Sequence, residues 1–313
     1  MAADLNELSA GMSRAVKRAA GYTVGVEGRG GYPSSGVLYD AGLVLSANHS
    51  VELEEDIRIL TADGSKRSAK VAGRDFLSDL VLLEIEKEVG KPAEPVNQSA
   101  QIGQLVIALG RPTEEGVQAS LGIVSIAEGA YRAHRGAALQ GVMRSDAKSL
   151  PGFAGGPLVD TNGMYLGVNT ISSSSGTSIT IPAALAGKIA EKLKSEGSSE
   201  PGYLGIRSQQ VELQHASSLN REQTSALLVI GIEADSPAAN AGIMVGDILV
   251  GFAGQPIRDH ESLLEQLLAG IGGKTVPAEL LRGGIRKEIS VTVGVLDRPF
   301  QGRRRGWHAR FCG

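Results

Sequence analysis

The stretch SLPGFAGGPLVD, residues 149–160, places three glycines and two prolines around the start of a short apolar run. Glycine has no Cβ, so a loop of this composition can curl tightly and turn its N–H groups inward. This glycine density is hard to explain by packing alone. The stretch therefore predicts a strand that is preceded by a tight loop, with backbone N–H groups facing a developing negative charge.

Two earlier segments carry the other groups that such a site needs. LSANHS (residues 45–50) places His49 at the end of a predicted strand, and RDFLSDLVLLEI (residues 74–85) places Asp79 at the entrance of another. In nucleophilic catalysis a base takes the nucleophile's proton, and a buried carboxylate fixes the tautomer of that base. A single histidine or aspartate is usually structural. Together, the order histidine, aspartate, glycine-rich loop predicts a serine-protease site.

The surrounding sequence favours a mainly β fold. Short runs rich in Val, Ile and Leu recur, most of them bounded by Gly, Asp or Asn, which is typical of an antiparallel barrel or sandwich. The chain has 42 glycines and only 4% aromatic residues, a composition that suits many tight turns. The segment IPAALAGKIAEKLKSEG (residues 181–197) then changes to helical spacing.

Composition and charge exclude several classes of function. The net charge is -3 with 21% charged residues, so no basic field for nucleic acid is expected. The only cysteine is Cys312, which leaves neither a disulfide framework nor a cysteine ligand set; no metal or cofactor is expected. No apolar run is long enough to span a membrane. The N-terminus predicts an amphipathic helix rather than a signal peptide, and Arg303–Arg305 predict a solvated end.

From Thr23 to Leu193 the chain resembles HtrA/Deg serine proteases almost continuously. The resemblance is carried by three segments: SSGVLYDAGLVLSANHSV (34–51), LTADGSKRSAKVAGRDFLSDLVLLEI (60–85) and MRSDAKSLPGFAGGPLVDTNGMYLGVNT (143–170). It implies a trypsin-like double six-stranded β-barrel. It also implies site roles for four residues: His49 as general base, Asp79 as its orienter, and the N–H groups of Gly152 and Ala154 as oxyanion hole.

One departure from the family pattern falls on the nucleophile itself, because Ala154 stands where serine is expected. Alanine has no oxygen to attack a carbonyl, so the chain as written should not form an acyl-enzyme. Two explanations stay open: deliberate inactivation of an active endopeptidase, or a natural pseudoprotease that acts as a non-catalytic, chaperone-like peptide binder. The retained His–Asp pair favours the first, since a partly buried pair costs desolvation and often stabilises little.

The last hundred residues resemble an α+β PDZ domain. PGYLGIR (201–207) is similar to the carboxylate-binding loop, and ADSPAANAGIMVGDILVGFAGQPIRDHESLLEQLLAG (234–270) carries the strongest signature. A PDZ groove adds a ligand strand to a sheet edge and holds the ligand's C-terminal carboxylate. The expected peptide-binding residues are Tyr203, Leu204, Gly205, Ile206, Leu263 and Leu267, the last two on a helix at Glu261–Leu268.

Two further sets of residues are weaker candidates. Leu150, Ile179 and Ile181 could line an S1 pocket for a small apolar side chain, although both isoleucines could equally belong to the core. The loop EGAYRAHRGAALQG (128–141) carries Arg132 and Arg135, which could relay peptide binding to the protease site or could simply be solvated.

The resemblance also implies partners and place. We expect a PDZ-regulated endopeptidase of protein quality control that acts on unfolded or misfolded proteins, assembles as a homotrimer or higher multiple, and works in the cell envelope. The expected organisation is an N-terminal helix or oligomerisation segment at 1–20, a trypsin-like protease domain at 21–196, a linker at 197–202, a PDZ domain at 203–297 and a basic tail at 298–313.

Overall fold

The structure is a computed structural model that describes residues 5–30, 33–87, 89–96, 99–132, 138–172, 178–198, 202–213 and 221–295. The predicted basic tail at 298–313, with Cys312, lies outside the described residues, as does Arg135 of the predicted regulatory loop. Arg132 ends a strand, but its side chain is not among those described.

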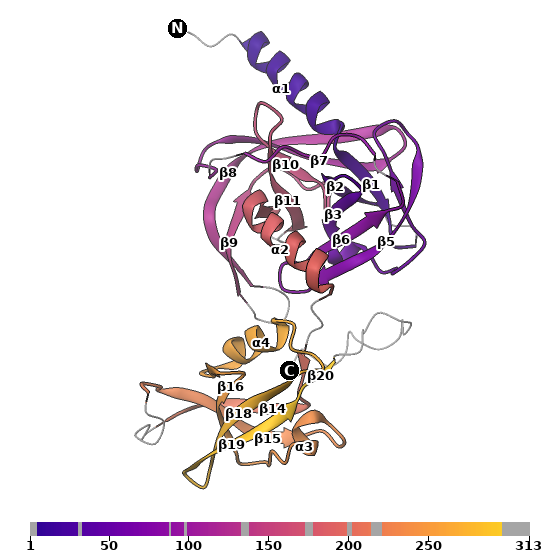
Figure 1. Ribbon diagram of the computed structural model, residues 1–313. Helices are drawn as coiled ribbons and strands as arrows, with labels where there is room; N and C mark the ends of the chain where they lie inside the picture. Colours follow the sequence, from indigo (N-terminus) through magenta and orange to yellow (C-terminus); the bar gives the residue numbers. More distant parts are fainter. Residues whose placement is uncertain are drawn as a thin grey trace.

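Two closed six-stranded barrels form the first part of the chain (Figure 1). In the first barrel the strands follow the order β1-β2-β3-β6-β5-β4 and every pair is antiparallel. Its strands are β1 (Thr23–Glu27), β2 (Ser34–Asp40), β3 (Leu43–Ala47), β4 (Ile57–Leu60), β5 (Lys66–Asp75) and β6 (Leu80–Ile85). A short 3-10 helix, η1 (Asn48–Ser50), follows β3.

The second barrel has the strand order β10-β11-β12-β9-β8-β7. Its strands are β7 (Leu105–Thr113), β8 (Gly116–Arg132), β9 (Ala138–Ser145), β10 (Pro157–Val159), β11 (Tyr165–Ser172) and β12 (Ser178–Pro182). One apolar cluster joins the barrels, because it contains fully buried residues such as Val44 of β3, Leu109 of β7 and Val168 of β11. The glycine-rich loop of residues 150–156 precedes β10.

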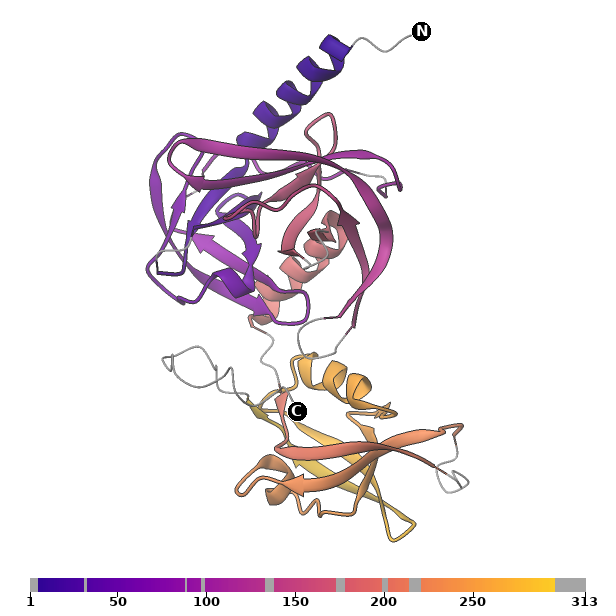
Figure 2. The ribbon, with the colours of Figure 1, turned by 180° about the vertical axis from the view of Figure 1, so that it is seen from behind.

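Two helices cover the barrels. In α1 (Leu5–Ala20), Ala15 and Ala19 are buried, and the backbone of Ala15 closely approaches Gly163. The N-terminal half of α1 extends away from the barrels (Figures 1 and 2). The predicted helix after β12 is α2 (Ala183–Glu196), which buries a regular stripe of small and apolar residues. That stripe is Ala183, Ala186, Ala190 and Leu193.

The C-terminal unit has one sheet in the order β14-β15-β16-β18-β19 and a separate pair, β13-β20. Its strands are β13 (Gly202–Tyr203), β14 (Ile206–Glu212), β15 (Ser225–Ile232), β16 (Ile248–Phe252), β17 (Gln255–Pro256), β18 (Thr275–Arg282), β19 (Ile285–Thr292) and β20 (Gly294–Val295). Its helices are α3 (Pro237–Asn240) and α4 (His260–Leu268). A capping box between Asp259 and Ser262 starts α4.

The predicted fold class, two six-stranded barrels followed by an α+β PDZ domain, is confirmed. In both views α4 lies on the side of the PDZ unit that faces the barrels (Figures 1 and 2). No helix in the described part of the chain combines the length and the hydrophobicity that a bilayer crossing requires.

Candidate active site

Strand pairing brings His49 and Asp79 together. In the antiparallel β3–β6 pair Ala47 lies opposite Leu80, so the residue after β3 faces the residue before β6. The ladder continues one step further, where the Asn48 N–H donates to the Asp79 carbonyl at 2.8 Å. His49 is the next residue along the chain. Its position beside Asp79 therefore follows from the register of two buried strands.

The Asp79 carboxylate binds His49 twice. One oxygen, Oδ1, accepts the His49 backbone N–H at 2.9 Å, and Oδ2 lies 2.6 Å from the ring Nδ1. Asp79 has a left-handed backbone with φ 59°, a conformation that aspartate tolerates better than most residues. Its side chain is 12% exposed, whereas that of His49 is 43% exposed. The pair thus buries the carboxylate and leaves part of the imidazole accessible.

The electrostatic balance at His49 favours a protonatable ring. Burial lowers the pKa of His49, but the hydrogen bond to Asp79 and the charge of that carboxylate outweigh it, and the pKa is raised overall from 6.5. The guanidinium of Arg29 opposes the rise. Asp79 binds the ring at Nδ1. The other ring nitrogen, Nε2, has no hydrogen-bond partner among the residues that the structure describes.

The glycine-rich loop begins with a tight turn at Leu150–Phe153. Phe153 N–H donates to the Leu150 carbonyl at 3.0 Å, and Gly152 has φ 88°. Proline followed by glycine at the two central positions is the sequence that a type II turn requires. Phe153 is fully buried and packs against Gly110 of β7, where a Cβ would lie 2.6 Å from the aromatic ring. The turn is therefore fixed to the second barrel.

Ser35 of β2 fixes the same loop to the first barrel. Its N–H donates to the Ala154 carbonyl at 2.9 Å, and its hydroxyl donates to the Gly152 carbonyl at 2.6 Å. The Arg111 N–H donates to the Ser35 hydroxyl oxygen at 2.8 Å and so orients it. The Gly152 and Ala154 carbonyls thus both accept from Ser35. The N–H groups of the same two residues have no acceptor within the described part of the chain.

The loop also lies close to the histidine segment. Gly155 has φ 83°, and a Cβ there would lie 2.2 Å from the Ser35 carbonyl oxygen and 2.8 Å from the Ala47 nitrogen. Gly155 therefore contacts the end of β3 at Ala47. Ala154 directly precedes Gly155 in the chain, and His49 lies two residues after Ala47. The structure gathers His49, Asp79 and Ala154 at the junction of the barrels.

The predicted peptide-binding residues of the second unit gather at one edge of its sheet. β14 is the edge strand, and Gly205, with φ 73°, leads into it. Leu204 and Leu263 are buried in the same cluster, with Leu267 and Ile206 packed against it. Gly205 could not carry a side chain, since a Cβ there would lie 2.3 Å from the Ser236 Cβ.

Similarity to known proteins covers both units. The trypsin-like peptidase domain family matches residues 34–168, and the PDZ domain family matches residues 202–293. The serine endoprotease DegS of Escherichia coli (strain K12) is 30% identical over 310 residues, which is 92% of this chain and 87% of DegS. The chain belongs to the HtrA family of serine endoproteases.

Other HtrA relatives agree with this assignment. A probable periplasmic serine endoprotease, DegP-like, of Pseudomonas fluorescens is 33% identical over 84% of this chain, which spans 56% of that relative. The solved structure of the serine endoprotease from Yersinia pestis has a TM-score of 0.68 at 30% identity, covering 91% of this chain and 98% of that one. A serine-to-alanine variant of the HtrA-type protease AlgW, solved with a tripeptide, gives a TM-score of 0.69 at 28% identity, with 92% and 98% covered.

The S1 residues expected in this HtrA-family chain do not all lie in one place. Ile179 and Ile181 are buried in the core that joins the barrels, whereas Leu150 packs against a separate cluster of the second barrel. The Asn169 carbonyl of β11, which accepts the Gly155 N–H at 2.7 Å, connects this region to the loop. The S1 assignment stays a prediction.

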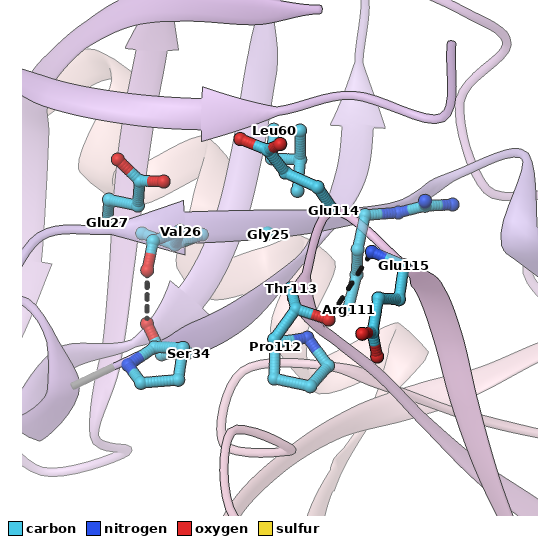
Figure 3. Close-up of a pocket in the computed structure, with 11 residues that line it drawn as sticks. Gly25, Val26, Glu27, Ser34, Leu60, Arg111, Pro112, Thr113, Glu114 and Glu115 are labelled. Carbon is cyan, nitrogen blue, oxygen red and sulfur yellow. Dashed lines mark hydrogen bonds between the residues drawn. The ribbon is translucent and has the colours of Figure 1, made fainter. Parts of the chain in front are cut away.

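A cavity of about 360 Å³ lies beside Arg111 and Pro112, at the end of β7 (Figure 3). Its walls come from β1, β2 and the β7–β8 turn, where Glu114 and Glu115 form an acidic rim. Lys66 bridges Glu114 to Glu27 at 3.0 and 2.9 Å. Pro112 lines the cavity and also contacts the Leu150–Phe153 turn, since a Cβ on Gly152 would lie 2.6 Å from the Pro112 Cβ.

Sequence reasoning missed the residues that support this HtrA-type site. Ser35 and the buried Arg74 hydrogen bond to its loops, and the backbone N–H of Arg111 donates to the Ser35 hydroxyl. Ser35 could have been noticed within the predicted histidine segment, but its role depends on a loop more than a hundred residues later. Arg74 and Arg111 carry no sequence signal, because arginine is usually a surface residue.

Proposed function

We propose that this framework is a serine endopeptidase site in which position 154 carries the nucleophile, His49 is the general base and Asp79 orients it. The Gly152 and Ala154 N–H groups form the oxyanion hole. The observation that carries the proposal is the pair of hydrogen bonds that the Asp79 carboxylate makes with His49, one with the backbone N–H and one of 2.6 Å with Nδ1. They lie beside a loop whose Gly152 and Ala154 carbonyls accept hydrogen bonds from Ser35. As written, Ala154 supplies no hydroxyl, so the chain is inactive as a hydrolase.

A serine at position 154 would restore the missing step. His49 Nε2 would take the hydroxyl proton as the oxygen attacks the substrate carbonyl, and Asp79 would stabilise the imidazolium through Nδ1. The negative charge that develops on the carbonyl oxygen would be met by the two N–H groups that lack an acceptor. His49 would then give its proton to the leaving amine, and water would complete the hydrolysis in the same way.

The test is the Ala154→Ser variant. It should degrade an unfolded casein-type substrate and react with a fluorophosphonate, which labels activated serines. The matched control is Ala154→Ser with His49→Ala, which keeps the serine but lacks the base and should not label. If the folded Ala154→Ser protein neither cleaves nor labels, even with a PDZ peptide present, the pseudoprotease alternative is favoured.

That alternative is supported by one observation, the alanine itself. A non-catalytic member would use the cleft and the PDZ groove to bind peptides, as a chaperone-like assembly would. The AlgW variant with alanine in place of a serine was solved with peptide. The chain as written can be tested for this role by measuring whether it suppresses the aggregation of an unfolded client protein at stoichiometric concentration.

We further propose that the PDZ groove binds C-terminal peptides with apolar last residues. The support is the free edge of β14, the loop Tyr203–Ile206 and the apolar face of α4. Calorimetry on the full chain should detect a peptide with a free carboxylate and not its amidated twin. Gly205→Ala should weaken binding, because the loop cannot accept a Cβ. Equal affinity for the two peptides would exclude carboxylate capture.

Regulation, assembly and location complete the proposal. PDZ peptides should raise the activity of the Ala154→Ser protein, and Arg132→Ala or Arg135→Ala should abolish that rise while leaving peptide affinity unchanged.

A homotrimer should be detected by sedimentation. Relatives of the chain are named as periplasmic endoproteases, which supports work in the cell envelope on unfolded or misfolded proteins.

A further inference from the structure

Arg74, next to the last residue of β5, is a buried cation beside the His49 segment. Its side chain is 4% exposed. Its guanidinium donates four hydrogen bonds to the chain after β3: to Asn48 Oδ1 at 2.7 Å, to the carbonyls of Val51 and Leu53 at 2.8 Å each, and to Glu54 Oε1 at 3.0 Å. All four acceptors lie within a few residues of His49.

The segment that receives these bonds has little regular structure of its own. After η1 the chain runs without helix or strand until β4. In the described part of the molecule no backbone N–H donates to the carbonyls of Val51 and Leu53. Burying a carbonyl without a partner is costly, so the Arg74 guanidinium supplies bonds that secondary structure supplies elsewhere.

Arg74 and Asp79 hold the histidine segment from two sides. Asp79 accepts the N–H groups of Asn48 and His49, while Arg74 binds the Asn48 side chain and the chain beyond His49. Arg74 lies near the end of β5 and Asp79 directly before β6, so the two residues flank the connection between these strands. We infer that Arg74 is a positioning residue for His49: its guanidinium fixes residues 48–54 and so keeps the imidazole aligned with Asp79. The inference rests on the proposed role of His49 as general base.

The chemistry of arginine explains why this position carries it. A planar guanidinium offers donors in several fixed directions, whereas the lysine ammonium is a single point that could not reach all four acceptors. Burial lowers the pKa of Arg74 to about 10, which still leaves the group charged at neutral pH. A shift of about 1 Å in a catalytic group can cost about a hundredfold in rate, so a small loss of alignment at His49 would be measurable.

The first experiment is independent of catalysis. In the chain as written, NMR titration of His49 should give a pKa above 6.5, together with a protected Nδ1–H resonance from the Asp79 hydrogen bond. Arg74→Met and Arg74→Lys should both lower this pKa toward 6.5 and weaken the protection. The lysine variant keeps the charge, so a shared effect reports on alignment. The other charged groups that face the ring, Arg29 and Asp79, are unchanged.

The second experiment measures rate in the Ala154→Ser background. Arg74→Lys should lower kcat about tenfold and change KM less than about twofold, because Arg74 binds residues 48–54 and acts through His49. Arg282→Lys is the matched control: Arg282 also binds a carboxylate and a carbonyl, but in the PDZ unit, and its loss should leave His49 unaltered. Glu54→Gln offers a milder variant if Arg74→Met does not fold.

The outcomes separate this inference from the proposed function. If the Arg74 variants fold and keep the parent His49 pKa and Nδ1–H protection, Arg74 is only a structural residue. If the titration behaves as expected but Ala154→Ser is inactive with Arg74 intact, the positioning holds and the proposed endopeptidase activity fails. A fall in thermal stability with an unchanged His49 titration also overturns the inference.

Discussion

Asp79 in the first barrel and Asp247 in the PDZ unit look alike in the sequence but have different partners. Each directly precedes a buried strand, in SDLVLL and GDILVG, and each accepts a backbone N–H, from His49 and from Met244. Asp79 then binds an imidazole, whereas Asp247 binds the Arg282 guanidinium with both oxygens at 2.7 Å.

The difference separates a pair that changes its charge state near neutral pH from one that does not. Arginine stays protonated at every pH that a folded protein meets, so near neutral pH the Asp247–Arg282 pair stays charged and links the start of β16 to β18. Histidine gains and loses its proton near neutral pH, and a base must do so in each turnover. Under the proposed function the first carboxylate would therefore serve the chemistry, whereas the second stabilises the fold.

The largest expected effect is on rate at Asp79. In the Ala154→Ser background, Asp79→Asn should lower kcat by about 10⁴-fold, because the amide no longer holds the imidazole in the productive tautomer. The measurement is hydrolysis of an unfolded substrate. Asp247→Asn is the control and should keep kcat within about threefold without added peptide. Similar losses from both variants would contradict the division between the two carboxylates.

The next effect is on stability at Asp247. Asp247→Ala leaves the Arg282 cation without its carboxylate and should cost about 3 kcal/mol of PDZ stability. Hydrogen exchange of the β16 and β18 amides would measure the loss. The pKa of Asp247 is lowered, although burial opposes this, because Arg282 and the Met244 N–H bind the charged form. This stability is present above the unfolded pKa of about 3.9 and is lost as pH falls through the lower folded pKa.

Arg282→His would convert the second pair into a copy of the first. A histidine that gains a carboxylate partner has a raised folded pKa, so its contribution is complete below an unfolded pKa of about 6.5. The contribution disappears as pH rises through the folded pKa. We expect the variant to be less stable at pH 9 than at pH 5 by about 1 kcal/mol, while the parent PDZ unit changes little over that range. Chemical unfolding at both pH values would show whether the identity of the cation decides the behaviour.

The smallest effect concerns the pH dependence of activity. A general base acts in its neutral form, and the pKa of His49 is raised. The acid limb of kcat/KM for the Ala154→Ser protein should therefore lie above pH 6.5, and activity should rise as pH increases through it. Asp247→Asn should leave the limb in place. A limb below pH 6.5 would mean that Asp79 does not stabilise the imidazolium in the working enzyme.

Local patterns were enough to predict much of this architecture. Short apolar runs bounded by turn residues predicted the strands, and the helical spacing of residues 181–197 predicted α2, which the structure places at Ala183–Glu196. These features depend on neighbours in the sequence, because turn residues and side-chain periodicity act within a few positions.

Contacts between distant segments could not be predicted in this way. The sequence left open whether Ile179 and Ile181 line a pocket or belong to the core, and the packing of the two barrels places both in a shared buried cluster. Ser35 supports a loop 117 residues further along, and Arg111 orients it from the other barrel. Such roles depend on how the two barrels pack against each other, and local sequence patterns contain no information about that packing.

The sequence by itself predicted which residues could perform the chemistry and at which position a nucleophile is expected. The order of His49, Asp79 and the glycine-rich loop, with Ala154 in place of a hydroxyl, can be read without coordinates. The family resemblance already implied that Asp79 orients His49, but only the tertiary structure showed that Asp247, which precedes a similar strand, binds the Arg282 guanidinium. The reason is physical: a carboxylate binds the cation that strand register brings to it, and register is set by the packing of the whole sheet.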